Sequence, residues 1–495
     1  MDVVTVPGRL DPAVLERAAA PLQVVVEPAA RERVSACEAF ALASIVDGRP
    51  VYGATTGFGP MVGYAGREDP VDQCGGLLDH LSVGQGRDLP PEVVRATMLV
   101  RLSSLSHGRS GVSLRVLDAL GAALGTTFAP AVPTLGSLGA SGDLCPLAHL
   151  TRALQGQGHA YVEGQRRPAA PALRQAGLVP LELTGRDALA LVNGTSLTVA
   201  AAGLALAKLR RAWSTAIDLS ALMVDLLGAS AEFAHPRLLD ALGHPGAVLA
   251  GQALRGRLAG LRPSGTRGLQ EPYSIRCTPQ LLGAVHTSIE HADSVIGADL
   301  NGVSDNPLFF PDQELVVHGG NFFGQPVAFA ADLLSMVAIQ LGNLAERQLD
   351  LLVDPHRNGG LQPMLSVEPG RQHGVQGVQL AATAILTNMR RQAMPASIQS
   401  LPTNGHNQDI VPLGTQAAIA ALEHAESLRW LHGSLAVALR QAGHLSSRQP
   451  TAAACAELLD RLAAVVAPID PDRGLHEDVR AAADLLDQLA GGGAR

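Results

Sequence analysis

The stretch GSLGASGDLCPLAH, residues 136–149, joins a glycine-rich turn to an apolar segment with helical spacing. In purely structural terms it is a loop that leads into a helix starting near Asp143. In chemical terms, Ala140, Ser141 and Gly142 are residue types from which a ring of backbone atoms can form, because Gly142 offers an unhindered nitrogen. Attack of the Gly142 nitrogen on the Ala140 carbonyl releases one water. Loss of the Ser141 hydroxyl as a second water leaves an electrophilic exocyclic methylene, a methylidene-imidazolone.

C-terminal to this loop, the hydrophobic pattern of the sequence changes near residue 195. The first 200 residues alternate short helical patterns with polar, glycine-rich turns, whereas later residues form long runs with helical apolar spacing. These runs cover residues 196–228, 286–300, 326–353, 412–442 and 451–467. We therefore predict a mainly α fold, with a mixed N-terminal domain (1–200) that carries the loop and a long central helical bundle (201–495).

Composition narrows the class of protein. Apolar residues make up 47% of the 495 residues and aromatic residues only 3%, which favours closely packed helices. The net charge of −8 comes without a clustered basic face, so we expect no nucleic-acid partner. The start has no signal-peptide pattern, and the apolar run 188–207 is interrupted by Asn193 and Gly194, which predicts a buried core helix and no membrane partner.

The cysteines indicate a reduced, cytoplasmic protein. There are five, they are scattered, and no paired-ligand spacing accompanies them, so we expect no structural metal. Cys145 and His149 lie four residues apart on the helix expected after the loop, and one such pair is more typical of packing than of metal binding.

Polar motifs interrupt the apolar sequence at several places. They are VYGATTGFGP (51–60), LVNGTS (191–196), QEPYSIRCTPQ (270–280), SDNP (304–307), HGGNFFG (318–324) and TNGHNQD (403–409). Each alone reads as a turn, a helix stop or a surface ion pair. Together they supply an arginine for a carboxylate, amides to orient it and a tyrosine to exchange a proton, which is a set suited to an α-amino acid. No lysine lies near them to bind pyridoxal phosphate, and no nucleotide-binding glycine motif is present.

In this order along nearly the whole chain, the motifs resemble the aromatic amino-acid lyase family of histidine, phenylalanine and tyrosine ammonia-lyases and related aminomutases. The resemblance implies the ammonia-lyase fold and a methylidene-imidazolone formed autocatalytically from Ala140, Ser141 and Gly142, with no metal or nucleotide. It implies converging helix N-termini around the ring and a homotetramer whose active sites are shared between subunits. The length resembles that of the compact bacterial enzymes.

The resemblance also implies residue roles. Tyr52 would remove the β-proton of the substrate, and Asn193 and Tyr273 would orient the ring and assist its formation. Arg276 would bind the substrate carboxylate with help from Asn321. Further substrate-binding positions implied by the family are Gly59, Phe323, Asn404 and Gln408. A tyrosine base at neutral pH needs a pKa below its usual value near 10, and we expect Arg276 and the helix dipoles to lower it.

The substrate is suggested by LLDHLSVGQG (77–86), which resembles the selectivity segment of the family. Its key positions fall on His80 and Leu81, and the family pairs His-Leu with tyrosine, Phe-Leu with phenylalanine and Ser-His with histidine. The asparagine at position 404 resembles the residue that tyrosine-acting members carry there. Gln408 occupies the position where histidine-specific relatives carry Glu. The resemblance therefore implies a tyrosine ammonia-lyase, which eliminates ammonia from L-tyrosine to give trans-p-coumarate.

Alternatives stay open at this stage. Phe323 followed by Gly-Gln resembles some aminomutases, so a tyrosine 2,3-aminomutase that makes β-tyrosine is one, and a phenylalanine or histidine ammonia-lyase is another. His80 could instead be a structural interior histidine. An inactive helical scaffold is the alternative without catalysis. A Ser-His hydrolase is disfavoured because Ser141 lies in G-x-S-G, not G-x-S-x-G.

Overall fold

A computed structural model describes residues 2–492 and divides the chain into two compact units. Unit 1 comprises Met1–Ala207, Ala292–Asp332 and Pro395–Leu422, and unit 2 comprises Lys208–His291, Leu333–Met394 and Glu423–Arg495. The predicted domains, 1–200 and 201–495, were continuous segments, whereas these units are not. The physical reason is that segments 292–332 and 395–422 pack back against the N-terminal part of the chain, for instance through a 3.0 Å hydrogen bond from Asn193 Nδ2 to Asn306 O.

Unit 1 is mixed, with short strands among helices. Its helices are α1 (Pro12–Arg17), α2 (Pro28–Val46), η1 (Gly59–Met61), α3 (Pro70–Leu81), α4 (Pro91–Ser106), α5 (Leu114–Leu124), α6 (Leu144–Leu154), α7 (Ala169–Gln175), α8 (Asp187–Val192), η3 (Pro311–Gln313) and η5 (Asn404–His406). Its strands are β1 (Asp2–Val6), β2 (Leu22–Val26), β3 (Gln85–Asp88), β4 (Ala129–Pro130), β5 (Pro133–Leu135), β6 (His159–Val162), β7 (Gln165–Pro168), β8 (Leu308–Phe310) and β9 (Leu315–Val317).

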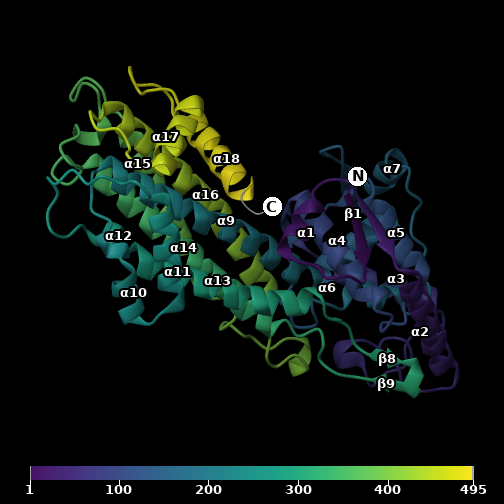
Figure 1. Cartoon of the computed structure of the whole chain (residues 1–495). Coiled ribbons are helices and arrows are strands. Elements are labelled where there is room, and N and C mark those ends of the chain that lie inside the picture. The colour runs from purple at the N-terminus through teal and green to yellow at the C-terminus, as the bar shows by residue number, and fades with distance from the viewer. Residues whose placement is uncertain (1, 493–495) are drawn as a thin grey trace. The chain divides into compact units, whose positions relative to one another are not determined.

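The strands form small separate sheets. β1 and β2 pair in parallel, β3 pairs with β5, β4, β6 and β7 form an antiparallel sheet, and β8 pairs with β9 in a hairpin with Phe309 opposite Val316. The hairpin lies beside α2 (Figure 1), where Phe309 packs edge-to-face on Phe40 with ring centroids 6.4 Å apart. This contact joins segment 292–332 to the N-terminal part of unit 1.

Helix α4 forms the centre of unit 1. Every residue from Val93 to Ser106 is buried, and α1, α2, α5 and β1 (Figure 1) pack against the helix, as does the short strand β4. Two arginines, Arg95 and Arg101, are among these buried residues. A charged side chain is rarely buried unless its donors are satisfied, so both arginines must have partners in the interior.

Four long helices begin in one unit and end in the other: α9 (Ser196–Leu226), α13 (Thr278–Leu300), α14 (Gln325–Val353) and α16 (Gly414–Leu445). Unit 2 also contains η2 (Glu232–Ala234), α10 (Pro236–Leu242), α11 (Pro245–Arg257), α12 (Tyr273–Arg276), η4 (Pro363–Leu365), α15 (Gln376–Arg391), α17 (Ala453–Val465) and α18 (His476–Gly492). These bounds confirm the predicted helical runs to within a few residues, except that α13 begins eight residues before the predicted 286.

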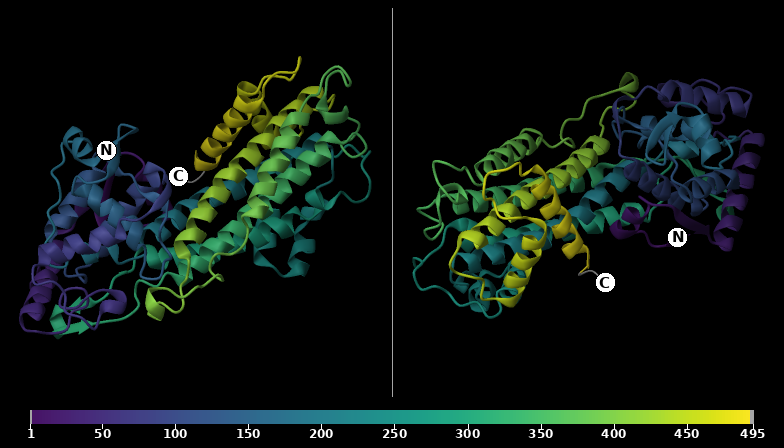
Figure 2. Two further views of the ribbon diagram at one scale, coloured as in Figure 1. Left: turned by 180° about the vertical axis from the view of Figure 1, so that it is seen from behind. Right: turned by 90° about the horizontal axis from the view of Figure 1, so that it is seen from above.

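The helices of unit 2 pack side by side (Figure 2). Gln348 on α14 donates a 2.9 Å hydrogen bond to Ser220 on α9, and Thr383 on α15 donates one of 3.2 Å to Glu346 on α14. Among the residues described, Asp187–Leu226 and Gln325–Val353 are long and apolar enough to cross a membrane, but 100% and 72% of their most apolar windows are buried inside the protein. Such burial is typical of core helices.

Candidate active site

The loop 136–143 folds back on itself. Isolated bridges join Gly139 and Ala140 to Gly142, which brings the two ends of the predicted ring together. Gly142 has a φ of 71°, in the left-handed region that favours glycine. A Cβ at this position would also collide with the Gly194 backbone. The residues present therefore fit a ring built from Ala140, Ser141 and Gly142, and only glycine fits at its third position.

Helix N-termini converge on this loop. α6 begins directly after it at Leu144, and the buried Asp143 carboxylate accepts hydrogen bonds from Thr198 N (2.9 Å) at the start of α9 and from Thr415 Oγ1 (2.8 Å) at the start of α16. Gly324, just before α14, adjoins Thr195, because a Cβ there would lie 3.2 Å from the threonine methyl. The positive ends of these helix dipoles favour negative charge at the loop.

Asp143 itself is an ionisable group in the interior. Burial raises the pKa of its carboxyl, and the hydrogen bonds from Thr198 and Thr415 oppose that rise. From the sequence we expected Asp143 only as the start of a helix, and Thr198 and Thr415 had no expected role. Asp143 adjoins Gly142 and could have been noticed, but nothing in the sequence marks Thr415, which lies 272 residues away.

Asn193 lies at the C-terminal end of α8 and precedes Gly194, whose backbone is in close contact with Gly142 of the loop. Its side chain is buried, its Nδ2 donates to Asn306 O (3.0 Å), and its Oδ1 has no hydrogen-bond partner among the residues described. A buried acceptor without a partner is costly unless something else binds there. The orphaned oxygen is consistent with a polar group of the ring or the substrate as its partner.

Tyr52 is half-buried, with its phenol directed to η1. The phenol oxygen accepts a hydrogen bond from Gly59 N (2.7 Å), and Tyr52 N donates to His318 Nε2 (3.2 Å), which brings the HGGNF segment alongside. Burial raises the pKa of the Tyr52 phenol, and the Gly59 hydrogen bond opposes this rise. The expected lowering is thus not found in the single chain, because Arg276 is not among the groups that act on the phenol and desolvation dominates.

His80 is connected to Tyr52 through Phe58. The Phe58 ring lies edge-to-face on Tyr52 with centroids 6.2 Å apart, and its centroid is 6.4 Å from that of His80. His80 is exposed, so it is not an interior histidine, and its Nδ1 contacts Gly76 O at 3.1 Å. Since a carbonyl can only accept, Nδ1 carries the proton in the neutral ring and Nε2 presents a lone pair. Leu81 follows at the end of α3 and is half-buried.

Gln408 reaches the loop directly. Its Nε2 donates to Ser141 Oγ (2.9 Å), and its Oε1 accepts from Thr403 Oγ1 (2.7 Å). Asn404, in the same turn, adjoins Gly59, because a Cβ on Gly59 would lie 3.9 Å from Asn404 Nδ2. The structure therefore brings the 51–60 and 403–409 motifs and the loop into one site.

Of the remaining predicted residues, Asn321 and Phe323 follow His318 in unit 1, and Tyr273 and Arg276 are in unit 2. Asn321 is exposed and lines a surface hollow of about 290 Å³ beside the β8–β9 hairpin, and Phe323 is half-buried, with its N donating to Gly320 O (2.9 Å). Tyr273 is 70% exposed, the Arg276 guanidinium lies 4.6 Å from the centre of its ring, and Arg276 Nη1 donates to Gln270 Oε1 (2.7 Å).

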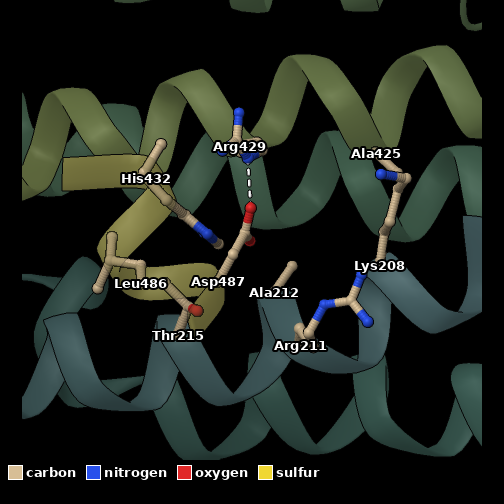
Figure 3. A pocket seen from close by; sticks show the side chains of 10 residues that line it. Lys208, Arg211, Ala212, Thr215, Ala425, Arg429, His432, Leu486 and Asp487 are labelled. Carbon is tan, nitrogen blue, oxygen red and sulfur yellow. Dashed lines mark hydrogen bonds and ion pairs between the residues drawn. The ribbon is translucent and has the colours of Figure 1, made fainter. Parts of the chain in front are cut away.

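Unit 2 also contains a small hollow between α9, α16 and α18 (Figure 3). Its volume of about 30 Å³ holds about one water molecule. Arg429 is ion-paired with Asp487, and Lys208 with Glu426 at 2.5 Å. Burial lowers the pKa of His432, which also lines the hollow, to about 4 and keeps it neutral. Size and charge pairing both exclude an amino-acid substrate from this hollow.

Comparison with known proteins identifies a family and solved relatives of similar fold. The family described as aromatic amino acid lyase matches residues 10–464. The chain is 39% identical over 488 residues to a tyrosine ammonia-lyase of Cereibacter sphaeroides, covering 94% of this chain and 93% of the relative. It is 38% identical over 473 residues to a histidine ammonia-lyase of Symbiobacterium thermophilum, covering 94% and 92%. A solved tyrosine aminomutase of Streptomyces globisporus superposes with a TM-score of 0.90 at 30% identity, covering 98% and 97%.

Proposed function

The chain belongs to the aromatic amino acid lyase family, and from this premise we propose that it eliminates ammonia from L-tyrosine to give trans-p-coumarate. The family match and the ammonia-lyase relatives indicate a carbon–nitrogen lyase, so the inactive-scaffold alternative is set aside. The observation that carries the choice of tyrosine is His80. With Nδ1 donating to Gly76 O, the Nε2 lone pair is free to accept the hydrogen bond of a substrate phenol, which phenylalanine lacks.

The prosthetic group would come from the chain itself. Ala140, Ser141 and Gly142 would close into a methylidene-imidazolone, whose methylene would bind the substrate amine and make it a better leaving group. The fold-back of the loop and the glycine-only geometry of Gly142 support this assignment. The helix N-termini and the Asp143 hydrogen bonds would hold the three residues in place.

The protein's own residues would then handle the proton and the carboxylate. Tyr52, as phenolate, would accept the β-proton, and the Gly59 N–H would stabilise the negative phenolate oxygen. Asn193 would use its unpartnered Oδ1 toward the bound amine or the ring. Arg276 and Asn321 would bind the carboxylate. The proton and the amine leave the substrate as ammonium, and the new double bond joins the α and β carbons.

We further propose a cytoplasmic homotetramer in which sites are completed by neighbouring subunits. Tyr273 and Arg276 belong to unit 2, and Tyr52, Ser141 and Gln408 belong to unit 1. Tyr273 is 70% exposed and Leu269 96% exposed in the single chain, which supports the burial of this segment by another copy. Light scattering coupled to size-exclusion chromatography would test it, and a monomer with full activity would contradict it.

Two other substrates or outcomes have support of their own. Phe323, Gly324 and Gln325 resemble aminomutases, and the solved tyrosine aminomutase is similar over nearly the whole chain. A histidine ammonia-lyase is supported by the identity to such relatives, but Gln408 stands where histidine-specific enzymes carry Glu.

Chromatography of the purified protein after incubation with L-tyrosine, L-phenylalanine or L-histidine tests the proposal. We expect p-coumarate from tyrosine as the main product. A majority of β-tyrosine would identify an aminomutase instead. Turnover of phenylalanine or histidine but not of tyrosine would refute the role given to His80.

A further inference from the structure

Arg101 is a fully buried arginine on α4 whose hydrogen bonds, within residues 2–492, end on backbone carbonyl oxygens. Its Nε donates to Ala190 O (2.9 Å), its Nη1 to Ser304 O (2.8 Å) and its Nη2 to Ala190 O and Asn193 O. Ala190 and Asn193 lie at the C-terminal end of α8, and Ser304 is the first residue of the SDNP motif. The guanidinium thus joins the two segments that flank Asn193.

Only the Gly194 backbone separates the Arg101 guanidinium from Gly142. A Cβ on Gly194 would collide with Arg101 Nη1, and a Cβ on Gly142 would collide with the Gly194 backbone. The Gly194 carbonyl also accepts a 2.7 Å hydrogen bond from the backbone N–H of Asp143, the residue that follows Gly142. Gly194 therefore lies between Gly142 and Arg101. The two close contacts are possible because neither Gly142 nor Gly194 has a Cβ.

Nearby carboxylates are engaged with other groups. Asp305 forms a buried two-pronged pair with Arg186 at 2.8 and 3.0 Å, and Asp143 accepts hydrogen bonds from Thr198 and Thr415. Burial lowers the pKa of Arg101 only to about 10, so the side chain is charged at neutral pH. A fixed positive charge in a water-excluded interior stabilises negative charge that develops close by.

We propose that Arg101 is a positioning residue for the prosthetic ring: it holds the Gly194 turn against Gly142 and supplies positive charge behind the ring. This inference rests on the ring proposed above. Closure forms the bond between Gly142 N and the Ala140 carbonyl carbon, and the Ala140 oxygen leaves as water with the amide protons of Ser141 and Gly142. The Ser141 Cα proton and hydroxyl then leave as the second water. Arg101 would act on both steps through Gly194, without touching the substrate.

Arg95 provides a matched control on the same helix. It is also buried, burial also lowers its pKa to about 10, and its hydrogen bonds also end on carbonyl oxygens. These belong to Ala18, Ala20, Ala123, Leu124, Thr126 and Phe128. They lie outside the loop, the 190–194 turn and the SDNP motif. Arg95 is thus a structural arginine of the same kind without the contact to the ring.

The experiment compares Arg101→Lys and Arg101→Met with Arg95→Lys and Arg95→Met in the full-length protein. Mass spectrometry of the loop peptide gives the fraction that has lost two waters, and kcat, KM and melting temperature are measured alongside. For Arg101→Met we expect at least a tenfold loss of ring content or a kcat about a hundredfold lower, with KM within about threefold. Arg101→Lys should recover part of the loss, because it restores the charge.

The Arg95 variants should lose thermal stability but keep full ring content. Complete ring formation and an unchanged kcat in folded Arg101→Met would overturn the proposal. If that variant does not fold, the lysine variants decide, and equal ring content in Arg101→Lys and Arg95→Lys would overturn it. An unmodified loop peptide in the unaltered protein would instead refute the proposed ring. A complete ring with no action on tyrosine would refute only the substrate assignment.

Discussion

The pH dependence of turnover follows directly from the environment of Tyr52. The phenol is half-buried, desolvation raises its pKa, and the single opposing contact of note is the 2.7 Å hydrogen bond from Gly59 N. If the phenolate is the base, kcat depends on the ionised fraction in the bound complex. We therefore expect kcat for the proposed substrate to rise steadily with pH across the neutral and mildly alkaline range.

The magnitude follows from the usual tyrosine pKa of about 10 as a lower bound. At pH 8 less than about 1% of the phenol is ionised, and each further pH unit multiplies that fraction about tenfold. Between pH 7 and 9, kcat should thus increase about a hundredfold. Tyr52→Phe should lower kcat by about 10²–10⁴ and abolish the alkaline rise, because no titrating base is left.

Initial rates of product formation at saturating L-tyrosine, measured from pH 6 to 10 as about half-unit steps with both proteins, provide the assay. At saturating substrate, ionisation of the free substrate amine contributes little to the pH dependence of the rate. Any pH dependence that remains in Tyr52→Phe comes from groups other than Tyr52. A plateau reached below pH 8 would refute the reasoning. It would mean that the phenol pKa is lowered in the assembled enzyme, as the sequence alone led us to expect from Arg276.

Three further outcomes follow from the site. Gly142→Ala should fold poorly or lack the loss of two waters in the loop peptide, because its Cβ would collide with Gly194 at a φ of 71°, and full ring formation in this variant would contradict the assignment. Asp143→Asn replaces one of the two acceptor oxygens with an amide donor, so the side chain can no longer accept from Thr198 N and from both threonine hydroxyls at once; the folded state should lose about 1–3 kcal/mol, measured by thermal unfolding, and an unchanged midpoint would count against the network. His80→Phe should lower the preference for tyrosine over phenylalanine by about 10–100-fold in the ratio of kcat/KM values, and an unchanged ratio would remove His80 as the selector.

The sequence predicted what depends on local pattern. The helices α9, α14 and α16 follow from apolar spacing, since the period of a helix is written in neighbouring residues. The proposed loop chemistry needs only three consecutive residues, because ring closure would join atoms of Ala140 and Gly142 that are covalently close. The family resemblance, carried by motifs in a fixed order, was confirmed by comparison.

The sequence could not give the partners of these groups. The discontinuous units, the Thr415 hydrogen bond to Asp143 and the stack of Gly142, Gly194 and Arg101 join residues that lie far apart along the chain. The pKa direction of Tyr52 in the single chain also differs from the sequence expectation, because a pKa depends on burial and on distances to charges, which no spacing encodes. The sequence by itself thus determined the helices and suggested the loop residues proposed to react, because both depend on neighbouring residues. The tertiary structure decided the electrostatics and packing around them, because these depend on distances through space.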